Sequence, residues 1–189
     1  MLNKPPGYLV SSGDPHHRRT VYDLLEGIKA RVFPVGRLDL DTRGVLLLTD
    51  DGALSYRLTH PRYGVKKTYR AHVEGVVSPG TLRRLCEGVL LEGGLTAPAE
   101  VRLVEGNGVL ELTLREGRKR QVKRMCGEVG HPVRELERTV FAGITTGGLE
   151  PGRWRHLSRG EVARLKQLVG LAAACVGTID AEEGHRHCD

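Results

Sequence analysis

The sequence predicts an α+β fold, with strands and short helices mixed along the chain and no internal repeat. Two kinds of signal support this class: runs of branched and aromatic residues bounded by glycine or proline, and helix-capping residues placed before segments of helical periodicity. A chain of 189 residues is also long enough to bury a core, as one domain or as two closely packed lobes.

Strand signals recur as short runs rich in valine, leucine and threonine. The expected strands cover residues 8–11, 45–49, 68–73, 99–104, 109–114 and 133–140. Four aliphatic residues directly after Gly44 are typical of a buried strand, so the segment before them is predicted to be a turn anchored by the sheet.

Helix signals lie between and after these strands. Ser78 followed by Pro79 predicts an N-cap and first helical position, opening a helix to about Glu87. Ser158 and Glu161 form a capping box ahead of a last helix that we expect to pack on the sheet. The folded domain is therefore predicted to cover residues 1–170, and residues 171–189 are predicted to form a flexible tail.

A third helix is indicated by apolar residues at positions i, i+3, i+4 and i+7: Val122, Met125, Cys126 and Val129. The same segment belongs to a basic cluster, because residues 115–124 hold six basic residues against one acid. Such a concentration favours a polyanionic partner. At the edge of the apolar face, the long side chain of Lys123 can reach toward the turn at Asp39.

Composition excludes several classes of protein. The net charge is +6 and the pI is about 9.3, and the apolar runs are far shorter than the ~20 residues that span a bilayer. We therefore expect a cytoplasmic protein with no membrane association. Cys86 and Cys126 are predicted to be buried thiols, and His185, His187 and Cys188 to belong to the solvated tail, not to a metal site.

Acidic residues are concentrated in the turn before the buried strand. Gly36 and Gly44 bracket this turn, so Asp39 can be aimed into a cleft, although an Asx-type turn is the structural alternative. Asp41 lies two residues farther and would point the same way in an extended stretch, so spacing alone does not separate the two. Asp50 and Asp51 are interpreted as helix-capping residues.

Three ordered motifs carry a resemblance to a known family. Residues 36–39, with Thr42 and Gly44, resemble the signature loop of the RsuA/RluB-type pseudouridine synthases, and residues 67–69 and 116–133 resemble the second and third motifs. The opening residues 2–7 resemble the entry strand of the catalytic domain. Many members carry a small S4-type RNA-binding domain ahead of this strand, and this sequence resembles the catalytic domain without it.

The resemblance implies a mostly antiparallel sheet flanked by helices, with a central cleft, in an enzyme that converts uridine to pseudouridine in RNA. It implies Asp39 as the catalytic carboxylate, opposed by the basic side chain of Lys123. Tyr69 would stack on the uracil or move a proton, and Arg37 would hold the base out of the helix. The remaining residues expected to bind substrate RNA are basic: Lys67, Arg118, Lys119, Arg120 and Arg124.

We expect a monomer that acts on ribosomal RNA or a ribosome-assembly intermediate without a cofactor or metal. The Asp14-Pro15 turn that leads to residues 20–25 looks more like that of members acting on large-subunit RNA, and small-subunit RNA is the alternative. Two other classes stay open. The four aspartates Asp39, Asp41, Asp50 and Asp51 could hold Mg²⁺ for phosphoryl transfer, or the chain could be an RNA-binding module without catalysis.

Overall fold

The computed structural model describes residues 1–171, apart from residues 14, 17 and 107. A seven-stranded sheet forms the framework, in the order β1-β3-β10-β5-β9-β8, with β11 paired to β10. All of its neighbouring strands are antiparallel except β3 and β10, which run parallel. Its strands are β1 (Leu2–Lys4), β3 (Thr42–Leu46), β5 (Lys67–Val73), β8 (Glu100–Glu105), β9 (Val109–Leu114), β10 (Val133–Phe141) and β11 (Ile144–Thr145).

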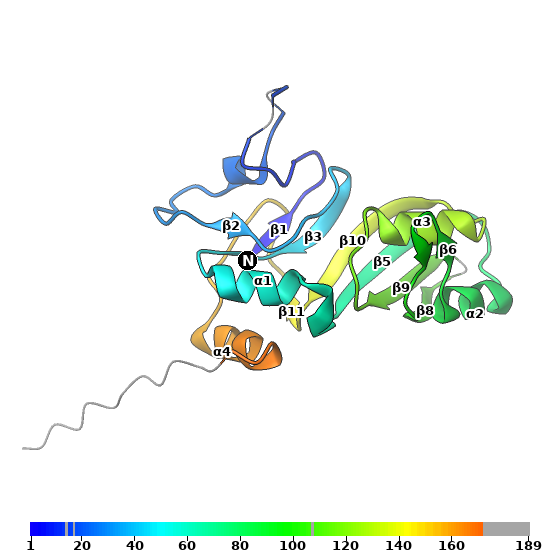
Figure 1. Ribbon diagram of the computed structural model, residues 1–189. Helices are drawn as coiled ribbons and strands as arrows, with labels where there is room; N and C mark the ends of the chain where they lie inside the picture. Colours follow the sequence, from blue (N-terminus) through cyan, green and yellow to red (C-terminus); the bar gives the residue numbers. More distant parts are fainter. Residues whose placement is uncertain (14, 17, 107, 172–189) are drawn as a thin grey trace, which may run out of the picture.

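Smaller elements surround this sheet. Two short antiparallel pairs join β2 (Phe33–Pro34) to β4 (Leu48–Thr49) and β6 (Leu90–Leu91) to β7 (Gly94–Leu95). The helices are η1 (Val21–Leu24), α1 (Gly52–Thr59), η2 (Pro61–Tyr63), α2 (Pro79–Glu87), α3 (Gln121–Glu128) and α4 (Arg159–Leu168). In Figure 1, β10 runs between the part with β1, β3 and α1 and the part with β5, β8, β9, α2 and α3.

One face of the sheet is apolar and covered by α2 and α3. Alternate residues of β5 and β9 point to this face and pack against Leu85 of α2 and Met125 of α3. The opposite face carries ion pairs such as Arg43–Glu137 and Arg102–Glu111. A second core joins α1 and α4 to Phe141 at the end of β10. The covered face is the one that continues into the site described below.

Most predicted elements are confirmed with small shifts of their ends. The strand over 109–114 and the helix from Pro79 to Glu87 are found at the expected bounds, and both predicted caps, Ser78 and Ser158, accept backbone hydrogen bonds. Asp51 caps α1 through the Leu54 backbone N–H, as expected. The segment 45–49 is divided between β3 and β4.

Two predictions are wrong. Residues 8–11 form no strand, because Leu9 makes an isolated bridge to Thr20 and the first strand is Leu2–Lys4. Cys86 is only partly buried, whereas Cys126 is buried, and burial raises the pKa of the Cys126 thiol to about 12. The tail predicted over 171–189, including its histidines, lies outside the described residues from 172 onward.

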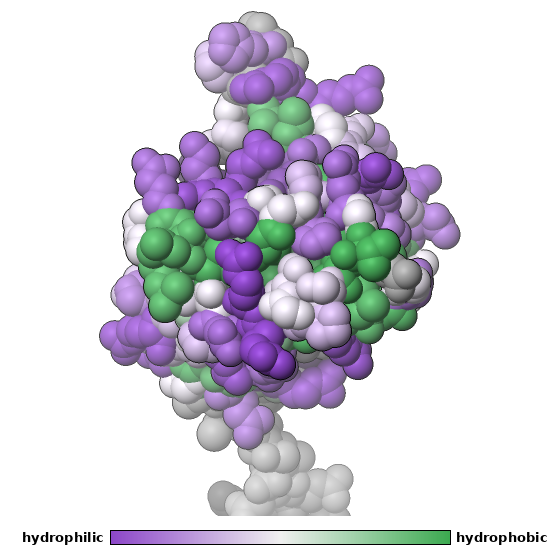
Figure 2. All heavy atoms as spheres, turned by 90° about the vertical axis from the view of Figure 1, so that its right-hand side faces the viewer, coloured by the Kyte–Doolittle hydropathy of each residue, from purple (hydrophilic) through white to green (hydrophobic). Residues whose placement is uncertain are grey.

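Several large apolar side chains are exposed near α2 and the β6–β7 hairpin. Val76, Leu90 and Leu95 are the most open of these. Figure 2, which views this end of the molecule, shows apolar surface in patches separated by a strongly polar strip. The monomeric state stays a prediction. Among the described residues, no helix has both the length and the apolar character needed to cross a bilayer.

Candidate active site

A cleft of about 460 Å³ opens where the covered face of the sheet runs beyond α3. Its walls come from the turn before β3, the first residues of β5, the middle of β10 and the loop that leads into α3. Asp39, Arg37, Lys67 and Tyr69 all line this cleft, together with the loop residues Arg118, Lys119 and Arg120. The structure therefore brings together three motifs that lie far apart in the sequence.

The turn that carries Asp39 is fixed by backbone hydrogen bonds. The Thr42 N–H donates to the Asp39 carbonyl at 3.1 Å, which closes a four-residue turn at the start of β3. The Gly7 N–H donates to the Leu40 carbonyl at 2.8 Å from the other side. The Asp39 side chain is half-buried and lines the cleft. The fixed backbone therefore holds the Asp39 Cα beside the cleft, where its carboxylate can meet a ligand.

Lys4 lies fully buried beneath this turn and was not identified from the sequence. Its Nζ donates to the carbonyl oxygens of Asp39, Leu40 and Thr42 at 3.2, 3.3 and 2.9 Å, and to that of Pro5 at 3.0 Å. Burial lowers the pKa of the Lys4 ammonium to about 8, although the nearby aspartates oppose this shift. The one signal in the sequence was its position in the opening segment 2–7, which resembles the entry strand of the family.

Lys123 pairs with Asp41 and not, as predicted, with Asp39. Its Nζ lies 2.5 Å from Asp41 Oδ1, and hydrogen bonding to Lys123 holds the pKa of the Asp41 carboxyl below its usual value. In the described part of the chain, no ion pair of Asp39 is found. The lysine reaches the predicted turn, but the carboxylate two residues farther along is the one that meets it.

Tyr69 stands on the sheet face that forms the floor of the cleft. It lies on β5, directly opposite Arg138 of β10, so the two side chains share one face. Lys67 precedes Tyr69 by two residues and therefore points the same way. Lys67 is 9 % exposed and donates to the Val65 carbonyl, so it lies inside the cleft and not on open surface.

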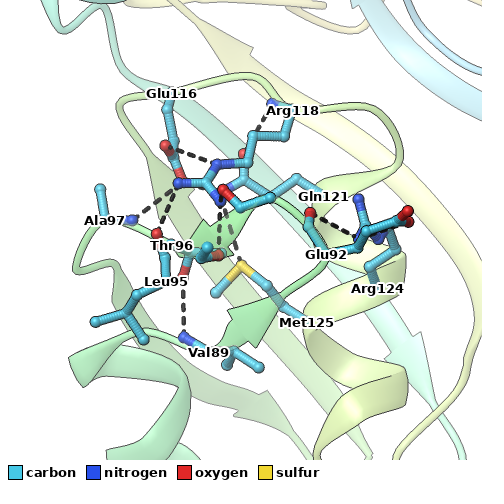
Figure 3. A network of polar contacts seen from close by, with 12 residues as sticks. Val89, Glu92, Leu95, Thr96, Ala97, Glu116, Arg118, Gln121, Arg124 and Met125 are labelled. Atoms are coloured by element: carbon cyan, nitrogen blue, oxygen red, sulfur yellow. Dashed lines mark hydrogen bonds and ion pairs between the residues drawn. The ribbon is translucent and has the colours of Figure 1, made fainter.

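Two basic residues of the third motif, Arg118 and Arg124, bind backbone carbonyls of the protein. Arg118 donates to the carbonyls of Gly94 and Leu95 at 2.8 and 2.7 Å, and Arg124 donates to the Glu92 carbonyl at 3.1 Å. Figure 3 shows both guanidinium groups engaged with the segment around the β6–β7 hairpin. Both side chains therefore stabilise the protein itself, and their contact with RNA stays a prediction.

Three other cations remain exposed beside the cleft. Arg37, Lys119 and Arg120 are exposed, and their side chains form no ion pair with any residue the structure describes. Arg120 has the left-handed backbone conformation, with φ of 52°, directly before α3. Non-glycine residues adopt this conformation rarely, and often at binding sites. These three side chains are free to contact a polyanion at the mouth of the cleft.

The four aspartates do not form a metal centre. Asp51 accepts the Leu54 N–H and pairs with Lys166, and Asp41 pairs with Lys123. Within residues 1–171, excluding the three omitted positions, no group of three histidine, cysteine or acidic side chains is arranged to hold a metal ion. The donor set therefore does not favour a two-metal phosphoryl-transfer site.

Comparisons with known proteins identify the family of this sequence. A family model described as RNA pseudouridylate synthase matches residues 1–128. The chain is 42 % identical to ribosomal large subunit pseudouridine synthase B of Bacillus subtilis (strain 168), covering 89 % of this chain and 71 % of the relative. It is 43 % identical to ribosomal small subunit pseudouridine synthase A of Escherichia coli (strain K12), covering 86 % and 71 %.

A solved structure shows the same architecture. The crystal structure titled pseudouridylate synthase superimposes with a TM-score of 0.81 at 36 % identity. The match covers 87 % of this chain and 71 % of the other. The arrangement of sheet and helices is therefore shared along most of the described chain.

Proposed function

This chain belongs to the RNA pseudouridylate synthase family, and from this premise we propose that it isomerises selected uridines of ribosomal RNA, with Asp39 as the catalytic carboxylate. It is accordingly an isomerase. One observation supports the assignment of Asp39 most strongly: its turn lies at a cleft that Tyr69 also lines, and a buried ammonium holds that turn.

The reaction breaks the C1′–N1 bond of uridine and forms a C1′–C5 bond, while a proton leaves C5 and another binds N1. The atoms of substrate and product are the same, so the reaction consumes no co-reactant. An ionised carboxylate can attack or stabilise either the ribose C1′ or the ring C6. Asp39 is the carboxylate that lines the cleft at the turn, whereas Asp41 does not line it.

Lys123 favours the ionised form of Asp41, the second carboxylate of the turn. The Lys123 side chain is 12 % exposed and its Nζ touches the Asp41 carboxylate in the same turn, and Lys4 lies beneath the turn. We therefore keep Lys123 as a proposed member of the site, acting on the turn through Asp41. Hydrogen bonding to Lys123 lowers the pKa of the Asp41 carboxyl, which opposes the effect of its burial.

The target base must leave its stack to reach Asp39, at a cost of a few kcal/mol. Tyr69 offers a ring on which the extruded uracil can stack, and Arg37 lies exposed at the cleft, where it can occupy the space the base leaves. Lys119 and Arg120 lie beside it and are proposed to bind backbone phosphates. Binding through such contacts weakens steeply as salt is raised.

The ribosomal subunit is the finer part of the proposal. Relatives named for the large and for the small subunit are almost equally similar to this chain, at 42 and 43 % identity. We favour large-subunit RNA, as a free molecule or in an assembly intermediate in the cytoplasm, because residues 20–25 resemble members of that group. These residues form the 3₁₀ helix η1 and its two caps, and Thr20 bridges to Leu9, which lines the cleft.

Mapping of modified sites tests both the isomerase activity on ribosomal RNA and the choice of the large-subunit RNA. Unmodified large- and small-subunit ribosomal RNA are incubated separately with the protein, with and without excess EDTA, and new pseudouridines are located. We expect modification of large-subunit RNA at the same rate in both conditions. Modification of small-subunit RNA alone would overturn the subunit assignment. Loss of activity in EDTA would favour a metal-dependent enzyme, and no product in either RNA would contradict the function.

Replacement of Lys4 by methionine is expected to lower kcat by about 100-fold, because small displacements of a catalytic group carry costs of this order. RNA affinity should change less than threefold. In the wild type, kcat should fall as pH rises through about 8, because the Lys4 ammonium then loses a proton. The neutral amine has only two N–H groups to donate to four carbonyls, so it holds the Asp39 turn less firmly. Kinetics from pH 6 to 10 measure both effects.

The stability of the wild type should move in the opposite direction over this range. Between pH 8 and 10.5 the unfolded chain keeps a proton on Lys4 that the folded protein has lost, so the free energy of unfolding rises with pH. Lys4→Met should lack this rise. A kcat that stays constant up to pH 10 in the wild type would show that Lys4 does not position the turn, even if the variant fails to fold.

A further inference from the structure

Arg138 is a buried cation in the cleft that neither the sequence motifs nor the site above has used. It lies in the middle of β10, opposite Tyr69 of β5 and Gly44 of β3, and is 2 % exposed. Its Nε donates to the Val45 carbonyl at 2.8 Å. Its Nη2 has no hydrogen-bond partner among the described residues, although the side chain lines the cleft.

The surroundings of Arg138 are cationic and aromatic. Its guanidinium carbon lies 4.7 Å from the centroid of the Phe141 ring, and Lys67 Nζ lies 5.8 Å from the same centroid. Neither cation is paired with a carboxylate in the part of the chain that the structure describes. Arg138 also lowers the pKa of Lys67, after the larger effect of burial. Two buried positive charges without a counter-charge are costly unless a ligand meets them.

A second buried polar atom points to the same conclusion. Thr42 Oγ1 also lacks a partner among the described residues, and Thr42 lines the cleft while its backbone forms part of the Asp39 turn. Unpaired buried donors and acceptors are rare in folded proteins because each loses its hydrogen bonds to water. Two of them lining the same cleft indicate that polar atoms of a ligand complete the site.

We propose that Arg138 Nη2 donates a hydrogen bond to a carbonyl oxygen of the extruded uracil, and that it stabilises the negative charge on the detached base. This inference rests on the proposed function. The base, not a phosphate, is the partner, because Arg138 is buried beside Tyr69 whereas Arg37, Lys119 and Arg120 are exposed where phosphates can stay hydrated. Uracil is the part of an extruded nucleotide that enters a cleft.

The charge balance of the reaction gives Arg138 its role. When the C1′–N1 bond breaks, its electron pair stays on the uracil ring and is shared by N1, O2 and O4. The charge is removed when C5 bonds to C1′, and the later loss of the C5 proton is balanced by protonation of N1. A fixed donor aimed at the atoms that become negative lowers the barrier more than it strengthens binding of the neutral base.

The test compares Arg138→Lys with the matched variant Arg134→Lys, which changes an exposed arginine of the same strand that pairs with Glu74. On a short RNA carrying the mapped uridine, Arg138→Lys should lose about 100- to 1000-fold in kcat, the scale for removing one such donor. Its Kd for RNA should stay within threefold, and Arg134→Lys should match the wild type. A kcat within threefold of wild type for Arg138→Lys would overturn the proposal.

Sulfur substitution in the RNA tests the contact without changing the protein. The target uridine is replaced by 2-thiouridine or 4-thiouridine, because a thiocarbonyl is a weaker acceptor but makes the base a better leaving group. At least one substitution should slow the wild type, because the weakened hydrogen bond outweighs the better leaving group, and this identifies O2 or O4 as the partner. The same substitution should not slow Arg138→Lys, which lacks the contact. Full wild-type rates with both would refute the contact, even if the variant does not fold.

The two proposals fail in distinguishable ways. Absence of pseudouridine with the wild type and unmodified RNA contradicts the proposed function. Normal wild-type activity combined with an active Arg138→Lys variant contradicts only the role of Arg138.

Discussion

Replacement of Asp39 by asparagine is expected to lower the rate of pseudouridine formation by about 10⁴-fold or more, the scale seen when a reacting group is removed. Asparagine has nearly the same shape, and Asp39 has no ion-pair partner among the described residues that the change would leave unpaired. The melting temperature should therefore stay the same. RNA affinity should be equal or slightly higher, because one negative charge near the phosphates is lost. Single-turnover kinetics and an RNA-binding titration measure these quantities.

The matched control is Asp41→Asn in the same turn. Asp41 is largely exposed and pairs with Lys123, so its loss should cost no more than about tenfold in rate and little stability. The sequence alone could not separate these two carboxylates. If Asp41→Asn were inactive and Asp39→Asn active, the catalytic assignment would have to move by two residues.

Replacement of Gly44 by alanine is expected to have the largest effect on stability. Gly44 has φ of 108°, and a Cβ there would overlap the carbonyl oxygen of Arg138 and lie 2.9 Å from its backbone nitrogen. Backbone strain and steric overlap each cost about 1–3 kcal/mol, so we expect a loss of about 3 kcal/mol or more. The melting temperature should fall by roughly 6–12 °C. Calorimetry measures this change.

Gly127→Ala is the control for the glycine itself. Gly127 lies in α3 without a positive φ, and a Cβ there would meet nothing within 4 Å. Alanine favours a helix by up to about 1 kcal/mol over glycine, so this variant should be as stable as the wild type or more stable. A Gly44→Ala variant of wild-type stability would show that β3 and β10 can move apart at no cost.

The sequence predicted the local elements well because their signals are local. The caps at Ser78 and Ser158 and the apolar spacing in α3 each depend on residues within one or two turns, and the structure confirms them. The predicted strand over residues 8–11 was wrong for a related reason. Its residues have strand propensity, but β1 occupies the edge of the sheet instead. Propensity alone did not show which of the two neighbouring segments, 2–4 or 8–11, would pair with the sheet.

The site was predicted only in part, because long-range contacts leave no pattern in a single sequence. The motifs placed Asp39, Tyr69 and the third-motif loop at one cleft, as found. Lys4 and Arg138 were missed since a lysine or arginine in a strand normally indicates a solvent-facing position. Likewise, the cluster at 115–124 was treated as one charged surface, whereas Arg118 and Arg124 bind backbone carbonyls near the β6–β7 hairpin.

The parallel pairing of β3 with β10 also has a consequence for folding during synthesis. Arg138 binds the carbonyl of Val45 across 93 positions of the chain, and Asn3, the neighbour of Lys4, binds the carbonyl of Leu149 across 146. Lys4 can support the Asp39 turn once the first 46 residues are made, but the turn gains its parallel flanking strand β10 only after residues 133–141 have left the ribosome. Contacts of such high sequence separation slow folding, so we expect the nascent chain to stay inactive until β10 has paired with β3.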